Sequence, residues 1–150
     1  MKSILIALGA SAILVAAASA QSATEKAMSG TWSCSAEGNG MAVTSTTNYL
    51  AGGKETFDIA IKGDAGGMQI EFTGNGTADW KFQPDGKLSE TITAITIKTA
   101  RMGGQEVPAA DMQAMVEGMI VGQASTSTVE VKDKAMTLVD ADGITTNCKR

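Results

Sequence analysis

Apolar and polar residues alternate along most of the chain from Gly30 onward. The pattern is cleanest in residues 55–62, where polar or small side chains separate Phe57, Ile59 and Ile61. A period of two residues predicts strands with one buried and one solvated face. Turn-forming residues divide the pattern into about nine such strands, at residues 30–36, 41–50, 55–62, 68–73, 78–82, 87–99, 125–132, 135–139 and 144–149.

The connections between these strands are rich in residues that favour turns. Asn75 and Gly76 are typical of a two-residue hairpin, because both central positions of that turn need a positive φ. Residues 84–86 and 140–143 predict two further turns through their Pro, Asp and Gly content. Short strands with frequent turns indicate an antiparallel barrel or a strongly curved sheet.

One predicted strand, at residues 87–99, changes its phase. Leu88 belongs to the even positions of the apolar pattern, whereas Ile95 and Ile97 belong to the odd positions. A β-bulge inserts one extra residue and moves the following side chains to the other face. We therefore expect a bulge near Ala94, which would bend the strand as barrels require.

Only one stretch of the domain has helical periodicity. Pro108 lies near its start and Gly122 follows its end, as is common for helices. The apolar residues at helical spacing are Met112, Met115, Val116, Met119 and Ile120. The predicted fold is thus mainly β, an antiparallel barrel or strongly curved sheet of eight or nine strands with one short amphipathic helix that is placed to cap one end.

The first twenty residues have the three parts of a secretory signal peptide. Lys2 supplies a basic start, residues 4–18 are mostly apolar, and residues 18–20 read Ala-Ser-Ala. The apolar run is shorter than the roughly twenty residues that a membrane-spanning helix needs. We expect cleavage after Ala20, then a flexible segment at residues 21–29, then a single domain at residues 30–150 with no membrane span.

The charge balance of the chain excludes one class of partner. The net charge is −4, and it becomes −5 without Lys2. A nucleic-acid-binding domain would need a clustered basic face, which the sequence lacks. We expect no nucleic-acid partner, and a location in the bacterial periplasm or outside the cell.

Cys34 and Cys148 are the two cysteines of the sequence. A pair of cysteines in an exported chain predicts a disulfide, because the destination compartment is oxidising. Such a bond would join the first and last predicted strands. The chain-entropy model assigns about 4.7 kcal/mol to loops of roughly this length.

The two ends of the domain resemble the lipocalins. Gly30-Thr31-Trp32 is similar to their Gly-x-Trp motif, and that family places an Arg of the last strand across the Trp ring. If Cys34 and Cys148 face each other on antiparallel strands, Trp32 and Arg150 become neighbours on the same face. The resemblance implies a closed barrel and a small apolar ligand.

The composition gives little support to an enzyme. The sequence has no His, and it has neither a nucleophile elbow nor a phosphate-binding loop. Asp58, Glu71 and Asp79 lie on adjacent predicted strands but at outward positions, which indicates a solvated sheet face. We predict no catalytic residues, no metal site and no cofactor.

Methionine is unusually frequent, with nine Met against three Phe, two Trp and one Tyr. Thioethers bind Cu(I), so Met112, Met115 and Met119 offer a copper-binding alternative. Met is also an ordinary filler of irregular cores and adaptable pockets, and this is the interpretation that we prefer.

Three functions therefore remain open. The leading hypothesis is a non-enzymatic binding protein for a small apolar molecule, with a ligand surface made of Trp80, Phe82, Met112, Met115 and Met119. The second is a structural or inhibitor-like module that binds another envelope protein. The third is Cu(I) binding through the helical Met residues.

Overall fold

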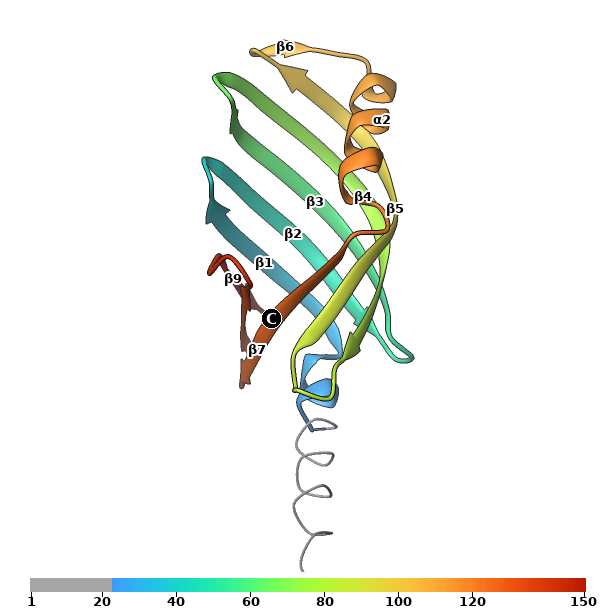
Figure 1. Cartoon of the computed structure of the whole chain (residues 1–150), viewed down its shortest axis with the longest axis vertical. Coiled ribbons are helices and arrows are strands. Elements are labelled where there is room, and N and C mark those ends of the chain that lie inside the picture. Colours follow the sequence, from blue (N-terminus) through green and yellow to red (C-terminus); the bar gives the residue numbers. More distant parts are fainter. Residues whose placement is uncertain (1–22) are drawn as a thin grey trace, which may run out of the picture.

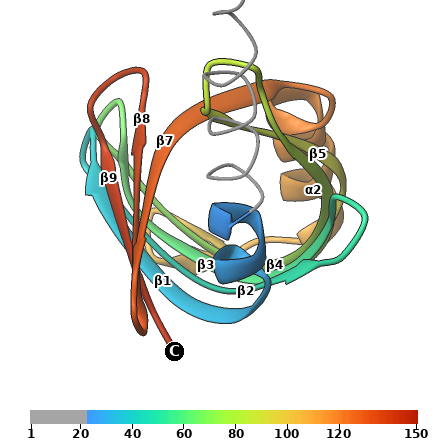
Figure 2. The same cartoon turned by 90° about the horizontal axis from the view of Figure 1, so that it is seen from below.

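Antiparallel strands form along the segments with the alternating pattern and close into a ring (Figure 1, Figure 2). The computed structural model describes residues 23–150, so the expected signal peptide at residues 1–20 lies outside the described residues. The elements are β1 (Gly30–Gly38), β2 (Met41–Leu50), β3 (Lys54–Ala65), β4 (Met68–Phe82), β5 (Leu88–Met102), β6 (Gln105–Glu106), α2 (Ala109–Ile120), β7 (Ala124–Lys132), β8 (Ala135–Asp140) and β9 (Thr145–Lys149).

All pairings in the ring are antiparallel. Strands β1 to β5 pair in chain order, β5 then pairs with β7, and β7, β8 and β9 follow in order. Strand β9 returns to β1 and completes the ring, while the two-residue β6 adds to the far end of β5. The predicted mainly β, barrel-like fold is confirmed.

The ring closes where the first and last strands meet. Cys34 pairs with Cys148 across β1 and β9, with a Cα–Cα distance of 4.0 Å, and the two form the predicted disulfide. The guanidinium carbon of Arg150 lies 4.3 Å from the centre of the Trp32 ring, as the register argument expected. Arg150 Nη1 also donates a hydrogen bond of 2.9 Å to the Ser29 carbonyl. Closure thus combines a covalent bond with a cation–π contact.

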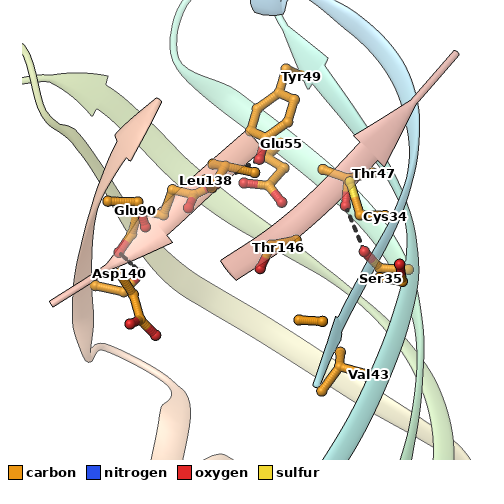
Figure 3. A pocket seen from close by; sticks show the side chains of 14 residues that line it. Cys34, Ser35, Val43, Thr47, Tyr49, Glu55, Glu90, Leu138, Asp140 and Thr146 are labelled. Atoms are coloured by element: carbon orange, nitrogen blue, oxygen red, sulfur yellow. Dashed lines mark hydrogen bonds between the residues drawn. The ribbon is translucent and has the colours of Figure 1, made fainter. Parts of the chain in front are cut away.

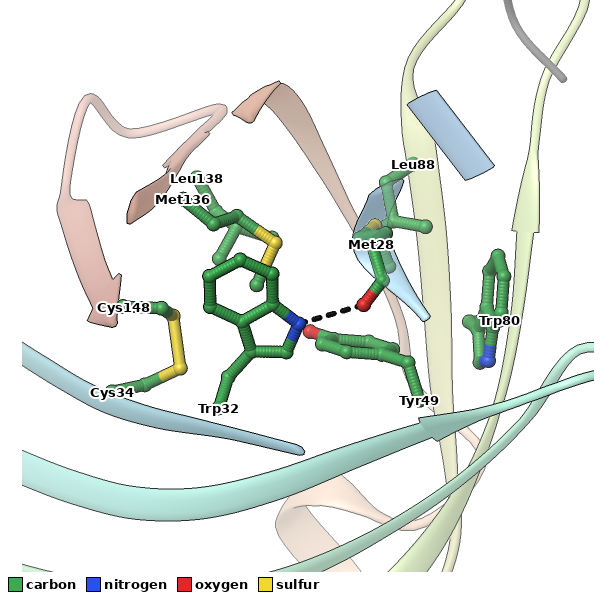
Figure 4. Close-up of a cluster of buried hydrophobic side chains, with 9 residues drawn as sticks. All are labelled: Met28, Trp32, Cys34, Tyr49, Trp80, Leu88, Met136, Leu138 and Cys148. Carbon is green, nitrogen blue, oxygen red and sulfur yellow. Dashed lines mark hydrogen bonds between the residues drawn. A yellow bond between two sulfur atoms is a disulfide. The ribbon is translucent and has the colours of Figure 1, made fainter. Parts of the chain in front are cut away.

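A short helix closes the lower end of the ring. Residues 21–29 were expected to be flexible, but residues 23–28 are helical, and Figure 2 shows this segment within the outline of the ring. The reason is that Met28 is fully buried and its carbonyl accepts a 2.7 Å hydrogen bond from the Trp32 indole. The surrounding apolar cluster (Figure 4) contains Met28, Trp32, Cys34, Tyr49, Trp80, Leu88, Met136, Leu138 and Cys148.

The predicted hairpin at Asn75 and Gly76 is wrong. Both residues lie inside the single long strand β4, which pairs with β3 on one side and β5 on the other along this stretch. A Cβ on Gly76 would lie 2.4 Å from the Ala94 carbonyl oxygen and 2.5 Å from the Phe57 ring. The glycine is needed for close approach of a neighbouring backbone and ring, and pairing on both sides overrides the local turn preference.

The bulge expected near Ala94 is present, and a second one follows it. Register shifts between β4 and β5 leave Thr93 and Lys98 without an opposite residue in the β4–β5 register. The first bulge moves Ile95 to the interior, and the second restores the even phase, so that Ala100 is buried. These two insertions let one strand of fifteen residues keep apolar side chains inward while it bends.

Helix α2 packs against the upper part of the ring through a narrow face. It spans Ala109–Ile120, within one residue of the prediction at each end, and it buries Met112 and Val116. No helix of the described residues is long and apolar enough to cross a membrane. The second apolar cluster contains Phe57, Phe72, Ala78, Ile95, Ile97, Ala100, Met112 and Val116.

On the edge away from β4, β5 pairs with β7 near its start and with β6 near its end, and the helix region covers the stretch between them. The Gln113 side-chain amide accepts a 2.7 Å hydrogen bond from the Ile97 N–H and donates one of 2.5 Å to the Ile95 carbonyl. The Gly122 N–H donates to the Ile92 carbonyl at 2.9 Å. These groups replace the missing strand, because each satisfies a backbone group that a ladder would otherwise satisfy.

Candidate functional site

A cavity of about 270 Å³ lies inside the ring (Figure 3). It is slightly smaller than the pockets of about 300–1,000 Å³ that usually hold small molecules. Most of its lining side chains carry oxygen atoms, and seven strands contribute to it. The lining residues are Cys34, Ser35, Ala36, Val43, Ser45, Thr47, Tyr49, Glu55, Glu90, Ser125, Ser127, Leu138, Asp140 and Thr146.

Two carboxyl groups and one phenol meet at the inner wall of this cavity. Glu55 is the first inward-facing residue of β3, and Tyr49 is the last inward-facing residue of β2. Glu90 lies near the start of β5. The Tyr49 hydroxyl donates a 2.9 Å hydrogen bond to Glu90 Oε1. Glu55 is only 8% exposed, and its buried Oε2 has no hydrogen-bond partner among the described residues.

The two carboxyl groups hold protons more tightly than carboxyls in water. Burial raises the pKa of Glu55 to about 9, and the charge of Glu90 and a hydrogen bond with it act in the same direction. Burial also raises the pKa of Glu90, although hydrogen bonds from Tyr49 and Glu55 oppose this. We infer that Glu55 carries the proton and donates it towards Glu90, as expected for two carboxyls that share one site.

Tyr49 serves as a fixed donor in this arrangement. Burial raises its pKa above the ordinary value for a phenol, and the charges of Glu90 and Glu55 raise it further. The hydroxyl therefore stays protonated at physiological pH. The ring is held by an edge-to-face contact with Trp80, at 5.8 Å between ring centres. Its position thus depends on the apolar cluster below the cavity.

A third carboxyl lies on the wall at the end of β8. Asp140 Oδ1 accepts hydrogen bonds of 2.9 Å from the backbone N–H groups of Asp142 and Ile144. These bonds hold the turn predicted at residues 140–143. No Lys or Arg occurs among the described residues that line the cavity, so its formal charges are all acidic.

The five residues predicted to form an apolar ligand surface do not come together. Trp80 and Phe82 contact each other in the apolar cluster around Trp32, whereas Met112 belongs to the second apolar cluster, beneath helix α2. Met115 and Met119 are 42% and 58% exposed. The helix packs at the rim of the sheet, so only a narrow stripe of its apolar face reaches the interior. None of the five lines the cavity.

The outward carboxylates lie where the alternation placed them. Asp58 forms an ion pair of 2.9 Å with Lys98, and Asp79 forms one of 2.6 Å with Lys54, both on the exposed outer face. Within residues 23–150, no group of three or more His, Cys, Asp or Glu is arranged to hold a metal ion.

Sequence reasoning missed both interior glutamates, although the alternation contained them. Glu55 has the same parity as Phe57, and Glu90 has the same parity as Leu88, so each belongs to the buried face of its strand. Carboxylates are rarely buried unless they are paired. Two such residues at inward positions of strands that share an interior are a pattern that could have identified the site.

The fold and the cavity define a class of protein: a small, disulfide-linked antiparallel β-barrel with an acidic interior lined by hydroxyl groups. Comparison of the sequence with models of known protein families and with curated proteins gives no match. Function is therefore inferred from the geometry of the cavity and the chemistry of its lining.

Proposed function

We propose that this protein is a non-enzymatic binding protein that holds a small polar molecule inside its barrel. The observation that carries the proposal is the cavity inside the ring, whose lining includes Glu55, a buried carboxyl with one oxygen that has no hydrogen-bond partner among the described residues. A buried polar atom without a hydrogen bond costs about 1–3 kcal/mol. A ligand with a suitable donor would recover that free energy.

The lining favours a polar ligand over the apolar one expected from the sequence. Ser45, Thr47, Ser127 and Thr146 present hydroxyl-bearing side chains around the carboxyl pair. An apolar molecule would leave these groups without partners after removing their water, which is unfavourable. The lipocalin-like contact between the first and last strands supports binding in a barrel interior, while the lining sets the polarity of the ligand.

Binding is favoured over catalysis by the position of the two carboxyls. Glycoside hydrolases keep their carboxyl groups about 5–9.5 Å apart, so that the scissile bond lies between them. Glu55 and Glu90 instead act directly on each other, because the charge of Glu90 and a hydrogen bond with it contribute to the raised pKa of Glu55. The pair is therefore suited to recognise a ligand rather than to cleave one.

The proposed location is the bacterial periplasm or the extracellular space. The disulfide between Cys34 and Cys148 supports it, because disulfides persist in oxidising compartments. The expected signal peptide leads to the same location. A binding protein there would encounter small polar molecules directly.

Native mass spectrometry of the purified protein, after incubation with a small-molecule extract of the cell envelope, tests the proposal. Ser45→Leu places a large side chain in the cavity, and Thr46→Leu places the same side chain on the outer face of the same strand. We expect a bound small molecule in the wild type and in Thr46→Leu but not in Ser45→Leu. Absence of any adduct, or equal retention by both variants, would contradict the proposal.

A further inference from the structure

The interior of the barrel has charge of one sign. Glu55, Glu90 and Asp140 come from three different strands, and no cation of the described residues lines the cavity with them. Electrostatic interactions are stronger in such an interior than in water, because the effective dielectric is lower. The site therefore repels anions and attracts cations.

Glu55 supplies an acceptor that no part of the described chain uses. The residue is only 8% exposed, and its Oε2 is a buried oxygen without a hydrogen-bond partner among the described residues. Glu90 is engaged on Oε1 by the Tyr49 hydroxyl. An ammonium group has three donors and no acceptor, so it complements a wall of carboxyl oxygens.

The hydroxyl groups around the carboxyl pair add a second requirement. Ser45 and Thr47 of β2 share a 3.2 Å hydrogen bond between their hydroxyls. Ser127, which also lines the cavity, is buried on β7. Hydroxyls both donate and accept, so they can pair with hydroxyls of a ligand. A purely hydrocarbon amine would satisfy the carboxyls but not these groups.

We propose that the ligand is a small hydroxylated amine, whose ammonium group binds at Glu55 and Glu90 while its hydroxyls bind the serine and threonine side chains of the cavity. This inference rests on the proposed function and narrows it to one chemical class. Neutral polyols share the hydroxyls but lack the cation. Anionic metabolites are excluded by the charge of the wall.

Binding is coupled to release of one proton. The raised pKa of Glu55 favours its protonated form in the free protein, and the arriving ammonium displaces this proton to solvent, so that a carboxylate–ammonium pair forms. The titratable groups that face the site are Tyr49 on β2, Glu55 on β3, Glu90 on β5 and Asp140 on β8. Affinity should therefore rise with pH, by at most tenfold per pH unit below the pKa of Glu55.

The test uses matched pairs of probes in phosphate buffer, which contains no amine. Ethanolamine is compared with ethylene glycol, and glucamine with sorbitol, by isothermal titration calorimetry at pH 6, 7 and 8. We expect at least one amine to bind at least tenfold more tightly than its neutral partner, with affinity that increases with pH. No amine binding at about 10 mM, a concentration well above the usual range for specific ligands, would overturn the inference.

Two variants on the same strand separate the site from general charge effects. Glu55→Gln keeps the size and the neutral state of the free protein but cannot become a carboxylate, whereas Asp58→Asn makes the same change on the exposed face. We expect Glu55→Gln to lose amine binding at least tenfold and to lose its pH dependence. Equal binding by the two variants would refute the assignment.

The two proposals fail in different ways. If the wild type retains an envelope molecule that Ser45→Leu loses, but amines bind no better than polyols, the ligand class is wrong and the binding function stands. If Ser45→Leu binds everything that the wild type binds, the cavity is not the binding site, and both proposals are wrong.

Discussion

Replacement of Glu55 by Gln should change how the stability of the protein depends on pH. The folded protein keeps a proton on Glu55 up to a pKa of about 9, whereas the unfolded chain releases it near the ordinary value of 4.5. Between these two values the folded state binds more protons than the unfolded state. Stability contributed by this group is therefore greatest below pH 4.5 and is lost progressively as the pH rises towards 9.

The magnitude follows from the linkage relation. One proton of difference corresponds to about 1.36 kcal/mol per pH unit, so the free energy of unfolding should fall by about 3 kcal/mol between pH 6 and pH 8. For a domain of this size, such a loss lowers the midpoint of thermal unfolding by roughly 10 °C. The Gln variant cannot release a proton at this position, so its stability should depend less steeply on pH, with Glu90 as the remaining buried carboxyl.

Urea unfolding at pH 6, 7 and 8, followed by tryptophan fluorescence, measures the effect, because Trp32 and Trp80 are both buried. Glu71→Gln is the matched control, since Glu71 is exposed on the outer face of β4. It should keep the wild-type dependence on pH. Equal loss of stability from pH 6 to pH 8 in the wild type and in Glu55→Gln would refute the protonation of the carboxyl pair.

Three further perturbations test the fold around the site. Reduction of the disulfide, which closes a loop with a sequence separation of 114 residues, should lower the free energy of unfolding by up to about 4.7 kcal/mol in urea titrations with and without dithiothreitol. Gly76→Ala should lower the free energy of unfolding by about 1–3 kcal/mol, because the new Cβ would overlap neighbouring atoms. Gly118→Ala, on the open side of α2, should leave it unchanged or raise it. Similar thermal unfolding midpoints for the two variants would contradict the packing described for β4. Gln113→Ala should accelerate amide hydrogen exchange in the middle of β5, and unchanged exchange there would show that other groups protect this edge.

Much of the ring could be predicted from the alternation of apolar and polar residues. The pairing of Cys34 with Cys148 placed the first and last strands side by side, and the phase change after Leu88 located the first bulge. These predictions succeeded because successive side chains of a strand face opposite sides of the sheet, so the face of each residue can be read from its position in the sequence. The second bulge, at Lys98, returns the apolar pattern to even positions, but only the small Ala100 and then Met102 mark that return in the sequence.

The remaining features depend on contacts between distant segments. Asn75 and Gly76 favour a turn locally, but strands on both sides of β4 hold them extended. The helical Met stripe predicted a wide buried face, whereas the position of α2 at the rim buries Met112 and exposes Met119. The inward parity of Glu55 was readable, yet the partner that makes its burial tolerable lies on another strand.

The contact between Arg150 and the Ser29 carbonyl has a consequence for chain topology. Strand β1 starts and strand β9 finishes at neighbouring points of the same closed ladder, so the order of the strands has no structurally privileged origin. A short peptide could bridge these points, and new termini could be opened at an exposed loop such as the one containing Gly103 and Gly104. Such a circular permutant would keep every interstrand pairing, with the order of synthesis as the only change.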